Sequence, residues 1–127
     1  ESVIYVRNTG ETTHPRTRQV MKPRPPEGPN MEDELDRRVK LAEWLTTKEN
    51  PFFAKNIANR VWGYLMGRGL VEPLDDIRQT NPASNPELLD ALAADFIQKK
   101  FDLKAIIRTI CNSQAYQLSS VKTPDNN

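Results

Sequence analysis

The chain has 127 residues, 37% of them hydrophobic, which suffices for one domain with a single modest core. Eighteen basic and seventeen acidic side chains leave a net charge of +1, and this balance argues against nucleic acid as a partner. The single cysteine excludes an internal disulfide bond, and no apolar run approaches the about 20 residues that span a bilayer, so we expect no membrane insertion.

Residues 1–32 predict an extended N-terminal arm or linker. The run SVIYVR at residues 2–7 is β-branched and aromatic, which is typical of a strand. Residues 12–30 hold five of the ten prolines and few apolar side chains. Because proline fixes φ and lacks an N–H group, we expect an extended arm, which could itself contribute a short strand or hairpin.

A first amphipathic helix is predicted from Asp33 to near Thr47. Apolar residues recur there at intervals of three and four, as one face of a helix requires. They are Leu35, Val39, Ala42 and Leu45. The connection that follows is short, so we expect the second helix to lie antiparallel beside the first.

A second helix is predicted to begin at Asn50 and Pro51, which suit an N-cap and a first helical turn. Apolar residues cover most of its circumference, which indicates the central helix of the domain. We therefore expect Val61 and Trp62 to be almost wholly buried. A narrow stripe stays polar and consists of Asn56, Asn59, Arg60 and Gly63.

Gly67 and Gly69 predict the end of the second helix, because glycine adopts the left-handed conformation without a Cβ penalty. A long connection at residues 68–84 follows. Long ordered loops often carry function, so this connection is where we look for a site.

Two patterns compete to cap the third helix. Ser84 and Glu87 have the spacing of a capping box, whereas Pro86 favours Asn85 as the cap. With either cap the helix begins at residue 85 or 86, and it is predicted to end near Lys100.

A fourth helix follows, with Asp102 as its predicted N-cap. Cys111 lies on its apolar stripe and is expected to be a small buried hydrophobic residue. These patterns predict an all-α fold with four principal helices in an antiparallel bundle-like core. We divide the chain into the arm at 1–32, a helical domain at 33–120 and a disordered polar tail at 121–127.

Several motifs between Arg37 and Ser120 resemble one family. They are RRVKLAEWLT, NPFFAKNIANRVWGYLMGRGLVEPLDD, NPASNPELLDALAADF and FDLKAIIRTICNSQAYQLSS. In this order they resemble the planctomycete cytochrome-associated PSD1 domain of unknown function (DUF1553). Asn85 stands where that family usually has a histidine, and Ile77 stands where it usually has an aromatic residue.

The resemblance implies a context rather than an activity. It implies a domain near the C-terminus of long, exported chains that also carry planctomycete-type cytochrome c domains. The expected location is therefore periplasmic or extracellular, and the expected partners are companion domains of the same chain. Haem is expected only in those companions.

We assign no cofactor, metal or catalytic residue to this chain. Covalent haem attachment needs two cysteines and a histidine, and a structural zinc site needs four ligands, but the chain has one cysteine and one histidine. Asp75 and Asp76 are neighbours, and neighbours in extended chain point to opposite sides rather than to one reacting bond.

A candidate site lies where the second helix ends and the long loop begins. Its residues are Asn56, Asn59, Arg60, Arg68, Asp75 and Asp76. They could form a latch, in which an arginine pairs with an aspartate and the asparagines hydrogen-bond the loop backbone. They could also line a ligand pocket. A latch has its charges paired and covered, whereas a site leaves them facing an open cleft.

We therefore expect a non-catalytic structural or interaction module of an exported, cytochrome c-associated multidomain protein. The alternative is a ligand-binding or hydrolytic domain that acts on extracellular material such as polysaccharide. Its residues would be Arg60, Arg68, Asp75 and Asp76.

Overall fold

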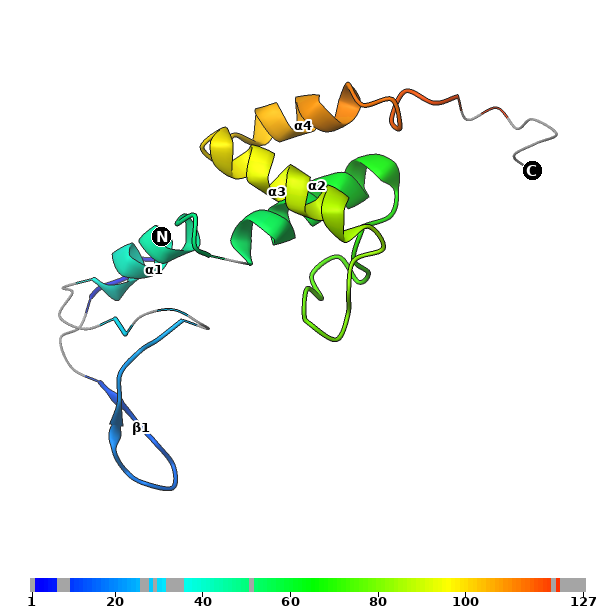
Figure 1. Ribbon diagram of the computed structural model, residues 1–127. Coiled ribbons are helices and arrows are strands. Elements are labelled where there is room, and N and C mark those ends of the chain that lie inside the picture. The colour runs from blue at the N-terminus through cyan, green and yellow to red at the C-terminus, as the bar shows by residue number, and fades with distance from the viewer. Residues whose placement is uncertain are drawn as a thin grey trace. The chain divides into compact units, whose positions relative to one another are not determined.

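The computed structural model describes residues 2–6, 10–25, 28, 30–31, 36–50, 52–119 and 121. Its elements are β1 (Thr12–Thr13), β2 (Val20–Met21), α1 (Arg37–Leu45), α2 (Phe53–Met66), α3 (Pro86–Gln98) and α4 (Leu103–Cys111) (Figure 1). The chain divides into two compact units, Glu1–Asn50 and Pro51–Asn127. The fold is mostly helical with one short hairpin, which confirms the predicted fold class.

The hairpin lies in the proline-rich segment. β1 and β2 pair antiparallel, with Thr12 opposite Met21. In the connecting turn, Nδ1 of His14 accepts the backbone N–H groups of Arg16 and Thr17, each at 3.2 Å.

The strand predicted for SVIYVR is wrong at residues 2–6. These residues have no regular structure and are exposed, and Arg7 lies outside the described residues. A β-branched run forms a strand only where a partner strand completes its hydrogen bonds. The turn chemistry around His14 gives that partnership to residues 12–13 and 20–21 instead.

α1 begins with Asp36 as its N-cap. The Asp36 carboxylate accepts the backbone N–H of Arg38 at 3.0 Å and pairs with the guanidinium of the same residue at 2.7 Å. The side-chain bond from Arg38, followed by its backbone bond, lowers the pKa of Asp36 below its ordinary value. The first residues of the predicted helix, 33–35, lie outside the described residues, and the observed helix ends at Leu45.

α1 belongs to the first compact unit and α2 to the second. The predicted packing of the first two helices against each other therefore stays a prediction. The same holds for the domain boundary at residues 32 and 33, since the division by compactness falls at Asn50.

The core of the second unit is built from α2, α3 and α4, which pack on one another (Figure 1). Its buried residues are Ala54, Ala58, Leu70, Val71, Leu89, Leu92, Ala93, Phe96, Ile106 and Ile110. The central aromatic residue is Phe96, whose ring makes a T-shaped contact with the ring of Phe101, with 5.4 Å between the centroids. Two of the core residues, Leu70 and Val71, come from the long loop rather than from a helix.

The start of α2 differs from the prediction. The helix begins at Phe53, and Phe52 occupies the N-cap position without a side-chain cap bond. Asn50 lies two residues earlier and is buried, and its side-chain amide donates to the carbonyl of Trp44 at 3.2 Å. At the other end, Gly67 has the left-handed conformation with φ of 79° and ends the helix, as predicted.

The caps of α3 and α4 are short polar side chains. Asn85, and not Ser84, caps α3, because its side chain accepts the N–H of Leu88 at 3.0 Å while Pro86 takes the first helical position. Glu87 lies in the first turn of the same helix. The carboxylate of Asp102 accepts two N–H groups at the start of α4, at 2.8 and 3.3 Å.

α2 buries its small residues rather than its large ones. Its buried residues are Ala54, Ala58, Asn59 and Gly63. Val61 and Trp62 are only partly buried, so the prediction of almost complete burial is wrong. Small side chains let the loop and the neighbouring helices approach the α2 backbone, and bulky side chains are left at the margins. Cys111 is likewise only partly buried.

Candidate functional site

The long loop after α2 is fastened to that helix by Asn59. The side-chain amide of Asn59 donates to the carbonyls of Val71 and Leu74, each at 2.9 Å. Its oxygen accepts the N–H of Val71, also at 2.9 Å. Asn59 has 0% of its surface exposed, so these three bonds replace water completely. An amide satisfies both backbone donors and acceptors, which suits a loop without regular pairing.

Two glycines let the loop approach α2 closely. A Cβ on Gly69 would lie 2.5 Å from the carbonyl oxygen of Val71 and 3.1 Å from Oδ1 of Asn59. A Cβ on Gly63 would collide with the side chain of Leu74. Gly69 was predicted to help end the helix, but its steric role is to make room for the Asn59 hydrogen bonds.

Asn81 closes the far part of the loop. Its side-chain amide donates to the carbonyls of Glu72 and Asp76, each at 3.0 Å. Ser84 fixes the last residues of the loop, since both its N–H and its hydroxyl donate to the carbonyl of Leu70, at 2.7 and 3.1 Å. Asn81 was not among the predicted site residues. The signal was the Asn-Pro step at residues 81–82, which is typical of turns.

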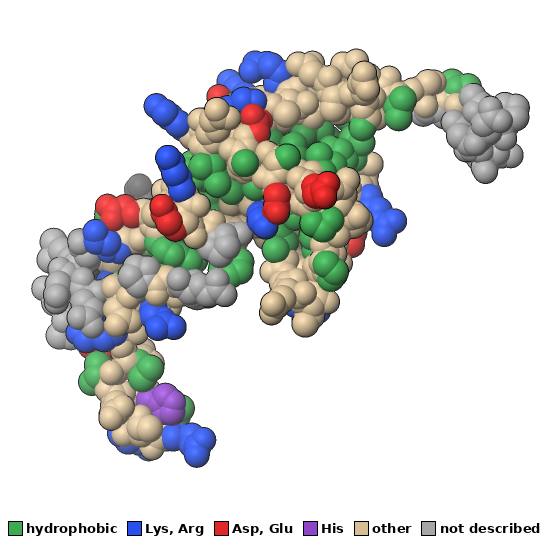
Figure 2. Space-filling model, in the orientation of Figure 1, with side chains coloured by type: hydrophobic (Ala, Val, Ile, Leu, Met, Phe, Trp, Pro, Cys, Tyr) green, Lys and Arg blue, Asp and Glu red, His purple; other side chains and the backbone are tan. Residues whose placement is uncertain are grey.

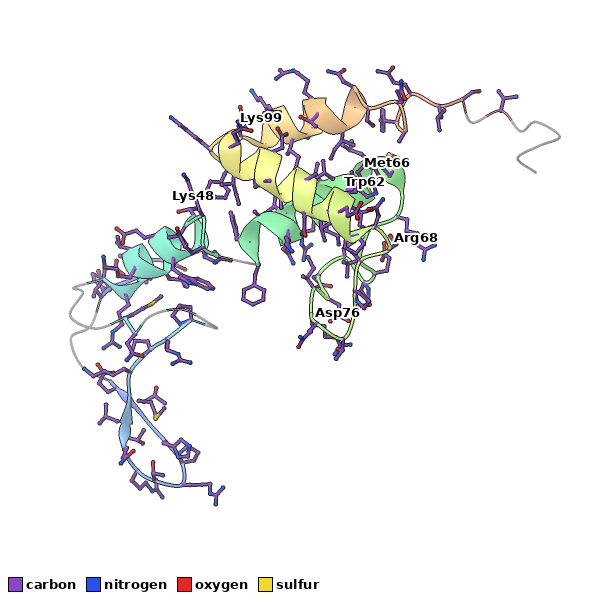
Figure 3. All side chains as sticks on the ribbon, in the orientation of Figure 1. Lys48, Trp62, Met66, Arg68, Asp76 and Lys99 are labelled. Carbon is purple, nitrogen blue, oxygen red and sulfur yellow. The ribbon has the colours of Figure 1, made fainter. Side chains whose placement is uncertain are left out.

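The predicted charged residues lie at the surface of α2 and of the loop. Nη2 of Arg60 lies 3.7 Å from Oδ2 of Asp75, with side chains 38% and 68% exposed, and Nε of Arg60 donates to Asn56 at 3.1 Å. Asp76 pairs instead with Arg78 at 3.0 Å. Arg68 has no ion pair with any described residue and lies well apart from Asp76 (Figure 3). The structure thus joins Arg60 to Asp75 and leaves Arg68 separate.

We expect the Arg60–Asp75 pair to contribute little to stability. A double-mutant cycle of Arg60→Ala and Asp75→Ala should give a coupling free energy below about 1 kcal/mol, because water screens a long, exposed ion pair. Urea denaturation of the four proteins measures it. The cycle of Arg68→Ala with Asp76→Ala is the control and should be additive. A coupling above about 2 kcal/mol would show that the charges, and not Asn59, hold the loop.

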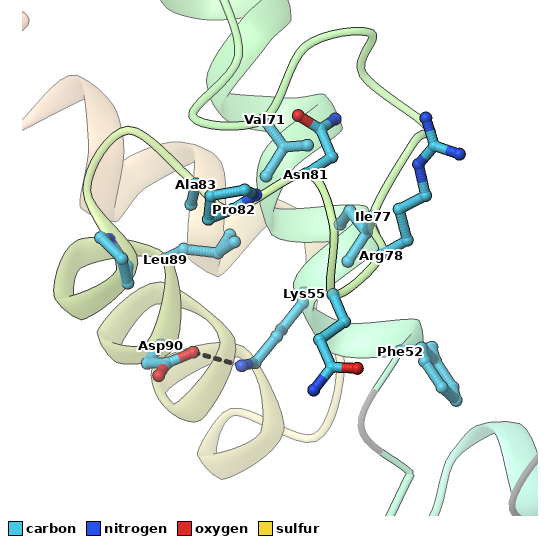
Figure 4. Close-up of a pocket in the computed structure, with 12 residues that line it drawn as sticks. Phe52, Lys55, Val71, Ile77, Arg78, Asn81, Pro82, Ala83, Leu89 and Asp90 are labelled. Carbon is cyan, nitrogen blue, oxygen red and sulfur yellow. Dashed lines mark ion pairs between the residues drawn. The ribbon is translucent and has the colours of Figure 1, made fainter.

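A pocket of about 360 Å³ opens between the loop, the start of α2 and the start of α3 (Figure 4). Its apolar wall consists of Phe52, Val71, Ile77, Pro82, Ala83, Pro86 and Leu89. Lys55 and Asp90 line it from the two helices and form an ion pair at 2.5 Å. None of the six predicted site residues lines this pocket. Most of its lining residues lie between residues 77 and 90, but Phe52 and Lys55 come from the start of α2, so no single local motif indicates the whole pocket.

Two features are absent from the described part of the chain. No group of three or more histidine, cysteine, aspartate or glutamate side chains is placed to hold a metal ion there. None of the described helices has the length and apolar character that crossing a membrane requires.

The fold and the site define a small helical domain whose long loop is hydrogen-bonded to α2 through the buried side chain of Asn59. Residues 37–127 match the family model described as PSD1, protein of unknown function (DUF1553), and the chain belongs to this family. Comparison with curated proteins and with solved structures gives no significant match.

Proposed function

We propose that this domain is a non-catalytic module that packs against companion domains of a longer, exported, cytochrome c-associated protein. The observation that carries the proposal is how the polar residues of the loop are used. The side chains of Asn59, Asn81 and Ser84 all donate hydrogen bonds to backbone carbonyls of the loop. A loop held in this way presents a fixed surface, which suits packing better than it suits chemistry.

Apolar residues on α4 supply a surface for such packing. Leu103 and Ile107 are 52% and 41% exposed and lie four residues apart, so they share one face of the helix. Ile106 and Ile110 of the same helix are buried, and at 100° per residue they adjoin that face. We call Leu103 and Ile107 the α4 ridge. The ridge extends the core surface outward and would be covered by a companion domain.

Basic side chains border the α4 ridge. Lys104 and Arg108 follow the two ridge residues directly, and Lys99 and Lys100 precede the helix. Figure 2 shows lysine and arginine side chains gathered over the corner between α3 and α4. An apolar ridge with a basic border would fit an apolar patch with an acidic border on the companion domain.

The proposal assigns the haem to companion domains, so this chain purified alone should show no haem absorbance. The alternative, a domain that binds or hydrolyses polysaccharide, would act through the charged residues of the loop. Arg60 and Asp75 are exposed, but neither they nor Arg68 and Asp76 line the pocket next to the loop. The packing function is therefore better supported.

Cross-linking in the full natural protein tests the proposed packing. An amine-reactive reagent should join Lys100 and Lys104 to lysines outside residues 1–127. The double variant Leu103→Ser, Ile107→Ser should reduce these cross-links about fivefold or more, because truncated interface residues cost binding free energy. Tyr64→Ser is the matched control, since Tyr64 is exposed on α2.

Either of two outcomes would contradict this proposal. One is the absence of cross-links from Lys100 and Lys104 to any other part of the protein. The other is an equal yield in the ridge variant and in the Tyr64→Ser control. Haem absorbance that purifies with residues 1–127 alone would contradict the assignment of the cofactor.

A further inference from the structure

We propose that the pocket beside the loop binds a small uncharged ligand built on a flat apolar ring system of about two fused rings. This site is separate from the α4 ridge and does not depend on the packing function. None of Arg60, Arg68, Asp75 and Asp76 lines it. The size, the walls, the charge and the rigidity of the pocket each restrict the ligand.

The volume sets the size of the ligand. The pocket holds about 360 Å³, which lies near the lower end of the range of about 300 to 1,000 Å³ for small-molecule sites. A dry apolar cavity of about 150 Å³ accommodates one benzene ring. A pocket a little more than twice as large therefore suits two fused rings rather than one ring or an extended chain.

The walls favour an apolar ring. Val71 and Leu89 line the pocket and are almost fully buried, and its other apolar lining residues are Phe52, Ile77, Pro82, Ala83 and Pro86. A fused ring system has no rotatable bonds, so the ligand loses little conformational entropy when it binds between these side chains. Burial of the ring against this wall supplies the free energy of binding.

The ionic groups favour an uncharged ligand. Lys55 is already paired with Asp90 at 2.5 Å, and Arg78 with Asp76 at 3.0 Å. Because each of these cations is paired with a carboxylate, the lining presents no unpaired charge that would attract an anion or a cation. Moving a charge from water onto the apolar wall would cost free energy. A neutral ligand leaves both pairs intact.

Hydrogen bonds within the loop hold the walls of the pocket in place. Val71 is held in place by Asn59, and the wall segment at residues 77–83 is closed by the Asn81 bonds to Glu72 and Asp76. A preformed wall binds without an ordering cost. Gln79 also lines the pocket, and its carboxamide makes no hydrogen bond to any other described residue. It can donate to, or accept from, one polar atom on the ring.

The test uses three probes that share one ring system: indole, indole-3-acetate and tryptamine. They are respectively neutral, anionic and cationic at neutral pH. Titration into the chain, followed by ¹H–¹⁵N NMR, should show indole shifting the amide signals of Val71, Ile77, Ala83 and Leu89. Both charged probes should bind about tenfold more weakly or worse, because of the cost of burying a charge.

Replacing each of two alanines by leucine shows where the ring binds. Ala83→Leu fills the pocket and should weaken indole binding by about tenfold or more, because an occupied cavity excludes the ring. Ala94→Leu is the matched control, since Ala94 is exposed on α3 and does not line the pocket. Should Ala83→Leu disturb the fold, the smaller Ala83→Val variant replaces it, with folding checked from the dispersion of the same spectra.

Each contrary result overturns a defined part of the proposal. A charged probe that binds as tightly as indole refutes the neutral ligand. Equal binding to the Ala83→Leu and Ala94→Leu variants shows that the ring binds elsewhere. Absence of any shift with indole refutes the site itself, while none of these results affects the cross-linking prediction for the α4 ridge.

Discussion

Replacement of Asn59 by alanine is expected to lower the free energy of unfolding by about 3 to 5 kcal/mol. The change removes three hydrogen bonds at a residue with no exposed surface. It leaves the N–H and carbonyl of Val71 and the carbonyl of Leu74 without partners. Each buried polar group that loses its partner costs about 1 to 3 kcal/mol, and partial entry of water keeps the sum below the maximum.

Urea denaturation followed by circular dichroism measures this effect. The matched control is Asn56→Ala on the same helix, whose side chain makes one partly buried bond to Arg60. The control should cost under about 1 kcal/mol. If Asn59→Ala costs no more than the control, Asn59 does not hold the loop, and the charged residues must be reconsidered.

Asn59→Asp adds a pH dependence with a definite sign. The introduced carboxyl would face two carbonyl oxygens without water, so the folded state favours its protonated form and its pKa is raised above the unfolded value of about 3.9. Stability contributed by the protonated carboxyl is present below about pH 4 and is lost as pH rises. The difference in stability from the unaltered chain should therefore grow between about pH 4 and pH 7.

Phe96→Ala is expected to have the largest effect in the core, about 3 to 5 kcal/mol. Phe96 is 1% exposed and packs edge-on against Phe101, so its removal leaves a cavity lined by rigid neighbours. Trp62→Ala, although it removes a larger side chain, should cost less, about 2 kcal/mol, because Trp62 is only partly buried. Thermal or urea unfolding of the two variants gives the order directly.

The reverse order would contradict the burial seen in the structure. It would place Trp62 at the centre of the core, as the periodicity of the second helix predicts. A further variant, Ile107→Ala, provides a control on an exposed apolar residue and should cost under about 1 kcal/mol.

Local signals in the sequence were sufficient for the helices and several of their ends. The spacing of apolar residues predicted four helices, and Gly67 ends α2 where a residue without Cβ is needed. Asp102 lies at the start of α4 with its carboxylate on two N–H groups. These features depend on interactions between residues within one or two helical turns of each other, so they can be predicted from the sequence without knowledge of the fold.

The competition between caps at α3 needed one more contact to resolve. Ser84 and Asn85 both suit an N-cap. Ser84 does not cap the helix, because its hydroxyl and its N–H both donate to the carbonyl of Leu70. That contact joins residues 14 positions apart. Local spacing therefore allowed both caps, and the position of the loop selected Asn85.

The helical class of this protein and its family can be predicted from the sequence, because both follow from local periodicity and ordered motifs. The complete burial of Asn59, on a stripe predicted to be polar, depends instead on the packing of the loop against α2. The same packing left Trp62 at the margin and enclosed a pocket between the loop and two helices. The physical reason is that an asparagine is buried only where a distant backbone supplies partners, and Val71 and Leu74 do so 12 and 15 residues away.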